Sequence, residues 1–180
     1  MKKYQKRDFP VGEARRFLEP SPTVLVTSHH KGETNIMTMN WYTILEFSPS
    51  LIGCMITSAN HSYDLIRKSK ECVINIPEMH LKMHVVGVGN SSGDEIDKFE
   101  TFKLTPQKAK KVSAPLIKEC FANFECKLVD AKMLNKYNFF IFEIVKAHVA
   151  TVPKYPKTIS YRGDGIFAVS DKNIKLPSKI

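Results

Sequence analysis

Short runs of β-branched, aromatic and other apolar residues recur along most of this chain, each ended by proline, glycine or polar turn residues. Residues 23–28, 51–57 and 71–76 are such runs. Residues 120–128 alternate between apolar and polar side chains, as a half-buried strand does. With turn signals at this spacing, we expect a mainly β protein of about six or seven strands, arranged as an antiparallel barrel with a few short helices.

The same pattern, in which turn residues end apolar runs, predicts the remaining helices and strands. A second strand should run over residues 35–47, a long one over 137–152 and a short one over 166–169, with helices over 62–68 and 78–88. Residues 87–93 are rich in glycine and serine and predict a loop. We expect residues 1–19 to form an N-terminal arm with a short helix around 13–18, and residues 153–180 to form a C-terminal extension. We see no repeat, linker or second domain, so a single domain over residues 1–180 is expected.

Composition narrows the class of protein. The chain carries 27 basic and 18 acidic residues, a net charge of +9, which favours anionic partners. No apolar run is long enough for a membrane span, and the charged start is not followed by an apolar segment, so a cytoplasmic location is expected. The four cysteines form no C-x-x-C pair. We expect Cys54 and Cys72 to be core residues, and Cys120 and Cys126 to share the apolar face of one strand.

Polar residues in the second predicted strand suggest a binding wall. Side chains alternate across a strand, so Thr38 and Asn40 lie on one face, and Met39 and Trp41 on the other. Two small hydrogen-bonding groups in an otherwise apolar strand suit a cleft that holds a planar polar ligand. The alternatives are that this face is half exposed to solvent and that Trp41 is an ordinary core aromatic.

Two loops could complete such a site. The segment Ser58-Ala59-Asn60 leads into the helix that holds Ser62, and the amides at a helix start favour a phosphate. Alternatively, Ser62 only caps its own helix. The second loop contains Ser92 and Gly93. After it, Lys98 offers a positive charge and Phe99 an aromatic wall, although this segment alone fits an ordinary solvated loop better.

Sequence motifs for metal, nucleophile, P-loop and nucleic-acid sites are weak or absent. His80 and His84 are spaced to chelate a metal on a helix, but no nearby glutamate or cysteine completes the set, so no metal site is expected. Nucleophile-elbow and P-loop motifs are absent from the sequence. A basic nucleic-acid-binding barrel would need aromatic residues interleaved in a basic groove, and the scattered lysines do not provide one.

In their order and spacing, these segments resemble the flavin-reductase-like family of FMN-binding split β-barrels, which includes flavoredoxin and the NADH:flavin oxidoreductases. The resemblance spans roughly residues 17–152. It rests on the segments 20–27, 38–41, 62–66, 73–76, 92–99, 115–117, 125–126 and 142–148, together with Gly32, Asn35 and Pro49. It departs from the family at Asn40, where serine is common, and at Asn60, where a basic residue is common.

The resemblance implies a homodimeric split β-barrel that binds FMN near the dimer interface. Residues Thr38, Met39, Asn40 and Trp41 would line the flavin, and the loop that contains Asn60 and ends at Ser62 would hold its phosphate. The implied function is an FMN-dependent oxidoreductase that takes electrons from NADH or NADPH. The alternative is a flavoredoxin-type electron carrier whose donor or acceptor is a redox partner protein. No nucleic-acid or membrane partner is implied.

Overall fold

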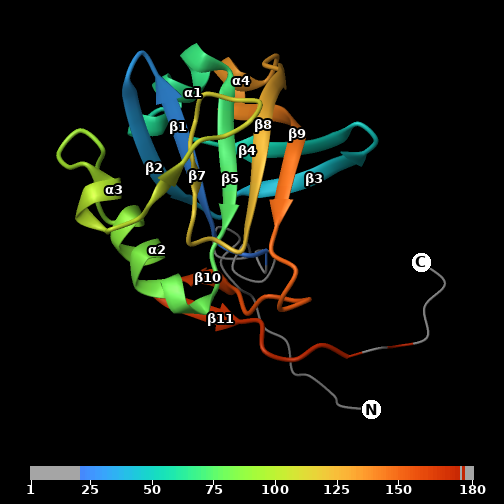
Figure 1. Ribbon diagram of the computed structural model, residues 1–180. Coiled ribbons are helices and arrows are strands. Elements are labelled where there is room, and N and C mark those ends of the chain that lie inside the picture. The colour runs from blue at the N-terminus through green and yellow to red at the C-terminus, as the bar shows by residue number, and fades with distance from the viewer. Residues whose placement is uncertain (1–20, 175, 177–180) are drawn as a thin grey trace, which may run out of the picture.

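The computed structural model describes residues 21–174 and 176, so the predicted helix around 13–18 lies outside the described residues. A seven-stranded antiparallel sheet dominates the fold, in the order β2-β1-β5-β8-β9-β4-β3 (Figure 1). Its strands are β1 (Val24–His30), β2 (Glu33–Met39), β3 (Tyr42–Phe47), β4 (Ser50–Met55), β5 (Glu71–Ile76), β8 (Ala122–Asp130) and β9 (Phe139–Val149). The sheet is not closed, because β2 and β3 are its two edges. The fold is therefore the expected antiparallel split β-barrel with a few short helices.

Within residues 21–174, two small hairpins and four short helices surround this sheet. The hairpins are β6 (Pro106–Gln107) with β7 (Leu116–Ile117), and β10 (Ile159–Gly163) with β11 (Ile166–Val169). The helices are α1 (His61–Ser69), α2 (Lys82–Gly89), α3 (Lys98–Thr101) and α4 (Leu134–Tyr137), and a 3₁₀ turn, η2 (Met79–Leu81), precedes α2. In Figure 1, α2 and α3 flank β2, and the β10–β11 hairpin lies at the lower end of the sheet.

The predicted strand over 35–47 is wrong in one respect, because the chain breaks it into β2 and β3. At Asn40 and Trp41 the backbone leaves β1 and crosses to β4, where the Met55 amide donates to the Trp41 carbonyl at 2.9 Å. The Asn40 side chain accepts a hydrogen bond from Thr23 Oγ1 at 2.6 Å, which holds this corner. The residue pattern on both sides of the corner is strand-like, so local periodicity does not reveal the break.

Two apolar clusters pack on opposite faces of the sheet, and β1 contributes to both. Val24 and Val26 lie in the cluster inside the barrel, whereas Leu25 lies in the cluster under α2. The prediction that Cys54 and Cys72 are core residues is confirmed. The prediction that Cys120 and Cys126 share one face is wrong. Cys120 precedes β8 and packs in the cluster under α2, whereas Cys126 lies inside the barrel.

The predicted loop over 87–93 begins too early, because Gly87 and Gly89 belong to α2. Both glycines allow close packing instead of a turn. A Cβ at Gly87 would lie 2.4 Å from the Phe102 ring, and one at Gly89 would lie 3.3 Å from Thr38. A bulkier helix could not approach β2 as closely. Gly89 therefore allows α2 to lie close to Thr38 of β2, and Gly87 allows it to lie close to Phe102.

Candidate functional site

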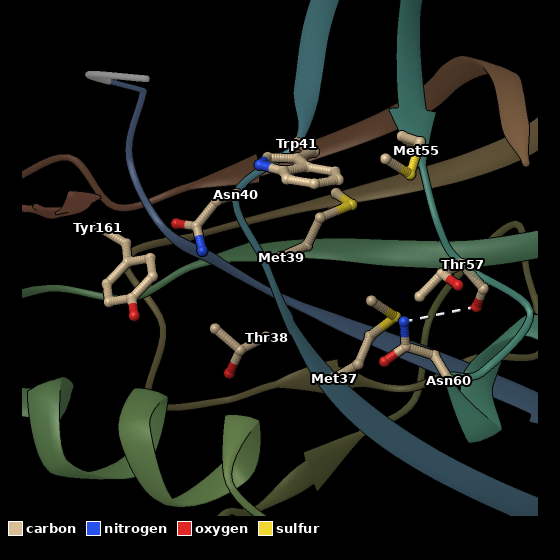
Figure 2. Close-up of a pocket in the computed structure, with 9 residues that line it drawn as sticks. All are labelled: Met37, Thr38, Met39, Asn40, Trp41, Met55, Thr57, Asn60 and Tyr161. Carbon is tan, nitrogen blue, oxygen red and sulfur yellow. Dashed lines mark hydrogen bonds between the residues drawn. The ribbon is translucent and has the colours of Figure 1, made fainter. Parts of the chain in front are cut away.

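A cavity of about 300 Å³ opens where β2 turns toward β3 (Figure 2). We call it the methionine-lined cavity, because three methionines, Met37, Met39 and Met55, line it. Polar side chains from β2, from the segment before α1 and from β10 face the same space. The lining residues are Met37, Thr38, Met39, Asn40, Trp41, Met55, Thr57, Asn60 and Tyr161. This mixture of apolar walls and a few polar groups is typical of ligand sites.

Hydrogen bonds hold the two predicted polar groups of β2 in place. Thr38 Oγ1 donates to the Val85 carbonyl of α2 at 2.7 Å. Asn40 Oδ1 accepts from Thr23, which leaves the amide nitrogen to donate to a ligand. Figure 2 shows this nitrogen directed toward the space bordered by Thr38 and Tyr161. Both residues are half-buried, so they do not lie on a fully solvated face.

Trp41 lies at the rim of the cavity and is 45% exposed, so it is not an ordinary core aromatic. Figure 2 shows its indole beside Met39 and Met55. On the opposite side, the Asn60 side-chain amide donates to the Thr57 carbonyl at 3.5 Å. A planar ligand in this cavity would have sulfur and aromatic surface on one side and amide and hydroxyl groups on the other.

A smaller polar cavity of about 180 Å³ adjoins the first and shares Met37 and Asn60 with it. The polar cavity lies at the start of α1. Its other lining residues are Asn35, Ala59, His61, Ser62, Ser91, Ser92, Gly93 and Lys98. Asn60 is the N-cap residue of α1, but its side chain makes no capping hydrogen bond. The first amides of α1 therefore have no side-chain cap, as an anion site at a helix start requires.

Ser62 does not cap its own helix. It is completely buried inside the first turn of α1, and its hydroxyl accepts from Asn35 Nδ2 at 3.0 Å. Ser28 Oγ donates to the same hydroxyl at 3.3 Å. The N-cap alternative for Ser62 is therefore excluded, and these contacts tie the polar cavity to β1 and β2.

Lys98 places an ammonium group in the polar cavity. The residue is only 6% exposed, and its Nζ donates to the Val88 carbonyl at 3.0 Å. Burial lowers the pKa of Lys98, and the nearby Asp94 carboxylate only partly opposes that shift. A bound anion would stabilise the charged form of this amine. The cavity thus combines a buried cation with the start of a helix.

His61 links three segments at the mouth of the polar cavity. Its Nε2 lies 2.5 Å from Glu33 Oε1, and its Nδ1 lies 2.5 Å from Asp94 Oδ1. Each ring nitrogen therefore faces a carboxylate oxygen. The histidine thereby joins the β1–β2 hairpin and the segment after α2 to the first turn of α1.

Not all of the remaining residues predicted for the site line the two cavities. Ser92 and Gly93 line the polar cavity, as does Ala59. Ser58 lines a neighbouring polar depression with Glu33, Asp64 and Lys68, which shares Ala59, Asn60 and His61 with the polar cavity. Phe99 packs against the apolar cluster under α2 and lines none of the cavities described here. Sequence reasoning missed the other lining residues, which are Met37, Met55, Thr57 and Tyr161 in the methionine-lined cavity and Asn35, His61 and Ser91 in the polar cavity. The Gly163-Asp164-Gly165 turn signal does mark the hairpin that carries Tyr161.

Among the described residues, no helix is both long enough and apolar enough to cross a bilayer. The fold and the site together define an open antiparallel barrel with an apolar cavity beside a polar, cation-containing one. A family model for the flavin reductase like domain matches residues 15–167. The chain therefore belongs to the flavin reductase-like family of FMN-binding split-barrel proteins.

Relatives and solved structures agree with this assignment. Uncharacterized proteins of Pyrococcus abyssi and Archaeoglobus fulgidus are 33% and 36% identical to the chain over 133 and 129 residues. These matches cover 74% and 72% of this chain, and 76% and 72% of the relatives. The flavoredoxin of Desulfovibrio vulgaris (Miyazaki F) has a TM-score of 0.80 at 23% identity, covering 99% of this chain and 98% of its own. An FMN-binding protein from Thermus thermophilus, with bound p-hydroxybenzaldehyde, has a TM-score of 0.81 at 20% identity, covering 98% and 100%. At these identities the two structures support the fold alone.

Proposed function

We propose that the chain binds FMN across the methionine-lined and polar cavities and passes electrons from a reduced nicotinamide, NADH or NADPH, to an acceptor. The observation that carries this proposal is the adjacency of the two cavities, which share Met37 and Asn60. FMN has the matching layout, with a planar ring at one end and a phosphate at the other. The residues present therefore fit the cofactor that the family implies.

Each part of FMN has a specified set of residues in this proposal. The ring lies with one side against Trp41 and the neighbouring methionines, where the Asn40 amide nitrogen donates to it. The phosphate accepts hydrogen bonds from the uncapped amides of α1 and pairs with Lys98. Asn60 carries no charge, so Lys98 supplies the cation that other family members place at that position. FMN, when bound, supplies the redox chemistry, and the chain binds and orients it.

The alternative is an electron carrier of the flavoredoxin kind, in which FMN stays bound and a redox partner protein exchanges electrons with it. The net charge of +9 favours an electron carrier, because it would attract an acidic partner protein.

Anaerobic mixing with NADH or NADPH distinguishes the enzyme from the electron carrier. An enzyme should show rapid bleaching of bound FMN at a rate that saturates with nucleotide. In a carrier, nucleotides should act slowly, and a reduced ferredoxin-like protein should act rapidly at a rate that falls with salt.

The proposed assembly is a homodimer built on β3. This strand is an edge of the sheet, and its apolar side chains are unusually exposed: Ile44 is 58%, Leu45 44% and Phe47 88% exposed. Edge strands with this much apolar surface are normally covered, and a second copy of the chain would do so. Because Trp41 lies just before β3, the dimer interface would run beside the methionine-lined cavity. Sedimentation analysis of the purified chain tests the dimer.

Two further predictions remain as the sequence made them. A cytoplasmic location is one of them and is kept as a proposal. The division into one domain over residues 1–180, with an arm over 1–19 and an extension over 153–180, is likewise retained as a proposal. In that scheme the extension contributes Tyr161 to the methionine-lined cavity, so its removal should weaken ligand binding.

A further inference from the structure

The polar cavity at the start of α1 opens toward solvent at one side. Of the described residues that line it, only Ala59 is exposed, and the others are buried or half-buried. Ala59 also lines the neighbouring polar depression, which has a volume of about 380 Å³ and shares Asn60 and His61 with the polar cavity. A group that extends from the polar cavity into solvent therefore passes over Ala59 into this depression.

Three carboxylates line the depression, those of Glu33, Asp64 and Asp94, and we call it the acidic depression. The side chain of each is more than half exposed. Lys68 is the only ammonium among the described residues that line it, and its Nζ lies 3.9 Å from Asp64 Oδ2. The acidic depression is therefore negative whether or not His61 is protonated, although the chain as a whole has a net charge of +9.

Two of these carboxylates are held at the boundary between the acidic depression and the polar cavity. The His61 ring lies between them, with its nitrogens 2.5 Å from Glu33 Oε1 and 2.5 Å from Asp94 Oδ1. The other oxygen of Asp94 accepts from Ser92 Oγ at 3.0 Å. His61 and Ser92 both line the polar cavity. The two carboxylates cannot turn away from an arriving anion without breaking these contacts.

The polar cavity and the acidic depression thus favour opposite charges. Lys98 and the uncapped amides of α1 suit a phosphate in the polar cavity, whereas the acidic depression repels one. A terminal phosphate ends inside the polar cavity. A pyrophosphate extends its second phosphate over Ala59, where it meets like charge and finds no cation free of a carboxylate among the described lining residues.

We propose that the polar cavity accepts the terminal phosphate of FMN and rejects the pyrophosphate of FAD. Glu33, Asp64 and Asp94 are the residues that determine this selectivity, and His61 positions two of them. The inference rests on the proposed function, because it takes the polar cavity as the site of the flavin phosphate. It adds which flavin the chain selects and the residues that exclude the other.

The first test is titration of the FMN-free chain with FMN and with FAD, followed by quenching of the Trp41 fluorescence. Both flavins carry the same ring, so the ratio of their affinities reports on the phosphate end alone. FMN should bind at least about tenfold more tightly than FAD in about 0.01 M salt. The ratio should fall in about 1 M salt, where the Debye length drops from about 30 Å to about 3 Å. Exclusion of the adenosine by size alone would leave the ratio independent of salt.

A double substitution separates these carboxylates from the overall charge of the chain. Glu33→Gln with Asp64→Asn keeps the size of both side chains and should lower the ratio of FMN to FAD affinity about threefold to tenfold. Asp130→Asn with Asp171→Asn is the matched control. It removes two carboxylates that also pair with lysines but line none of the cavities described here, and it should leave the ratio unchanged.

The outcomes distinguish this inference from the proposed function. Equal affinities of the wild-type chain for FMN and FAD would refute the selectivity and leave the FMN site in place. A preference for FMN that neither salt nor the double substitution lowers would remove the carboxylates from this role. A chain that binds neither flavin would refute the proposed function, and this inference with it. If the double variant does not fold, the salt dependence of the wild-type ratio decides.

Discussion

Replacing Lys98 with methionine should weaken FMN binding and leave riboflavin binding almost unchanged. Methionine has a similar length and shape but no charge. The buried ammonium of Lys98 lines the polar cavity proposed for the phosphate, which riboflavin lacks. A hydrogen bond to a charged group contributes about 1.5–3 kcal/mol, so the affinity for FMN should fall about tenfold to a hundredfold. The affinity for riboflavin should change less than about threefold.

The pH dependence of binding gives this prediction a second readout. Burial lowers the pKa of Lys98 in the FMN-free chain, and a bound phosphate favours the protonated amine and so raises that pKa. Affinity that depends on the charged amine is complete below the pKa of the free chain and is lost as the pH rises from that pKa to the raised pKa of the complex. The wild-type chain should therefore bind FMN less tightly at alkaline pH. Lys98→Met should remove this decline.

The assay is titration with each flavin, followed by fluorescence, together with urea unfolding of the FMN-free chain. Lys98→Met loses one hydrogen bond to the Val88 carbonyl but no longer buries a charge, so its free energy of unfolding should fall by no more than about 1 kcal/mol. Lys68→Met removes the same charge from an exposed position on α1 and serves as the matched control. An equal loss of affinity for FMN and riboflavin in a folded Lys98→Met chain would refute the phosphate site.

Three further perturbations test other parts of the account. Asn40→Asp keeps the oxygen that accepts from Thr23 but removes the amide donor. The affinity for FMN, measured by titration, should therefore fall at least about tenfold. An unchanged affinity would show that Asn40 does not contact the flavin ring. Glu125→Gln should lower the free energy of unfolding at neutral pH by about 3 kcal/mol, because this buried carboxylate accepts from two backbone amides and from His148. Burial alone would raise the pKa of Glu125, but these donors hold that pKa below its ordinary value. The difference in the free energy of unfolding between the wild-type chain and Glu125→Gln should therefore shrink as the pH falls through that pKa. A difference that does not depend on pH would contradict the role of the Glu125 carboxylate. Phe47→Glu should convert the dimer to a monomer in sedimentation analysis, and a persistent dimer would place the interface elsewhere.

The sequence predicted the strands well because each strand has a local signature. Alternation over 120–128 and the apolar run over 51–57 correspond to β8 and β4 within a few residues. The corner at Asn40 and Trp41 was not predictable in this way. It depends on Thr23 and Met55, which lie far away in the sequence. Gly87 and Gly89 predicted a loop from local sequence alone, but both belong to α2. They are needed there for close packing against Phe102 and Thr38, which local sequence does not reveal.

The candidate site shows the same limit. Residues within one short segment, such as Thr38 to Trp41, could be proposed from their alternation and from the family resemblance. Tyr161 could not, because it reaches the methionine-lined cavity only through the packing of the β10–β11 hairpin. Phe99 was expected beside the ligand. It follows Lys98 directly in α3, so its side chain points in a different direction and packs against the apolar cluster under α2. Which side of a short helix faces a cavity is decided by tertiary packing.

The chain offers a direct test of the central claim, because Trp41, its one tryptophan, lies at the rim of the methionine-lined cavity. Titration of the FMN-free chain with FMN should quench the tryptophan fluorescence and saturate at one FMN per chain. Riboflavin should quench it at the same stoichiometry but with at least about tenfold weaker affinity, because it lacks the phosphate. Fluorescence that FMN does not quench, or equal affinities for FMN and riboflavin, would contradict the proposed arrangement of ring and phosphate.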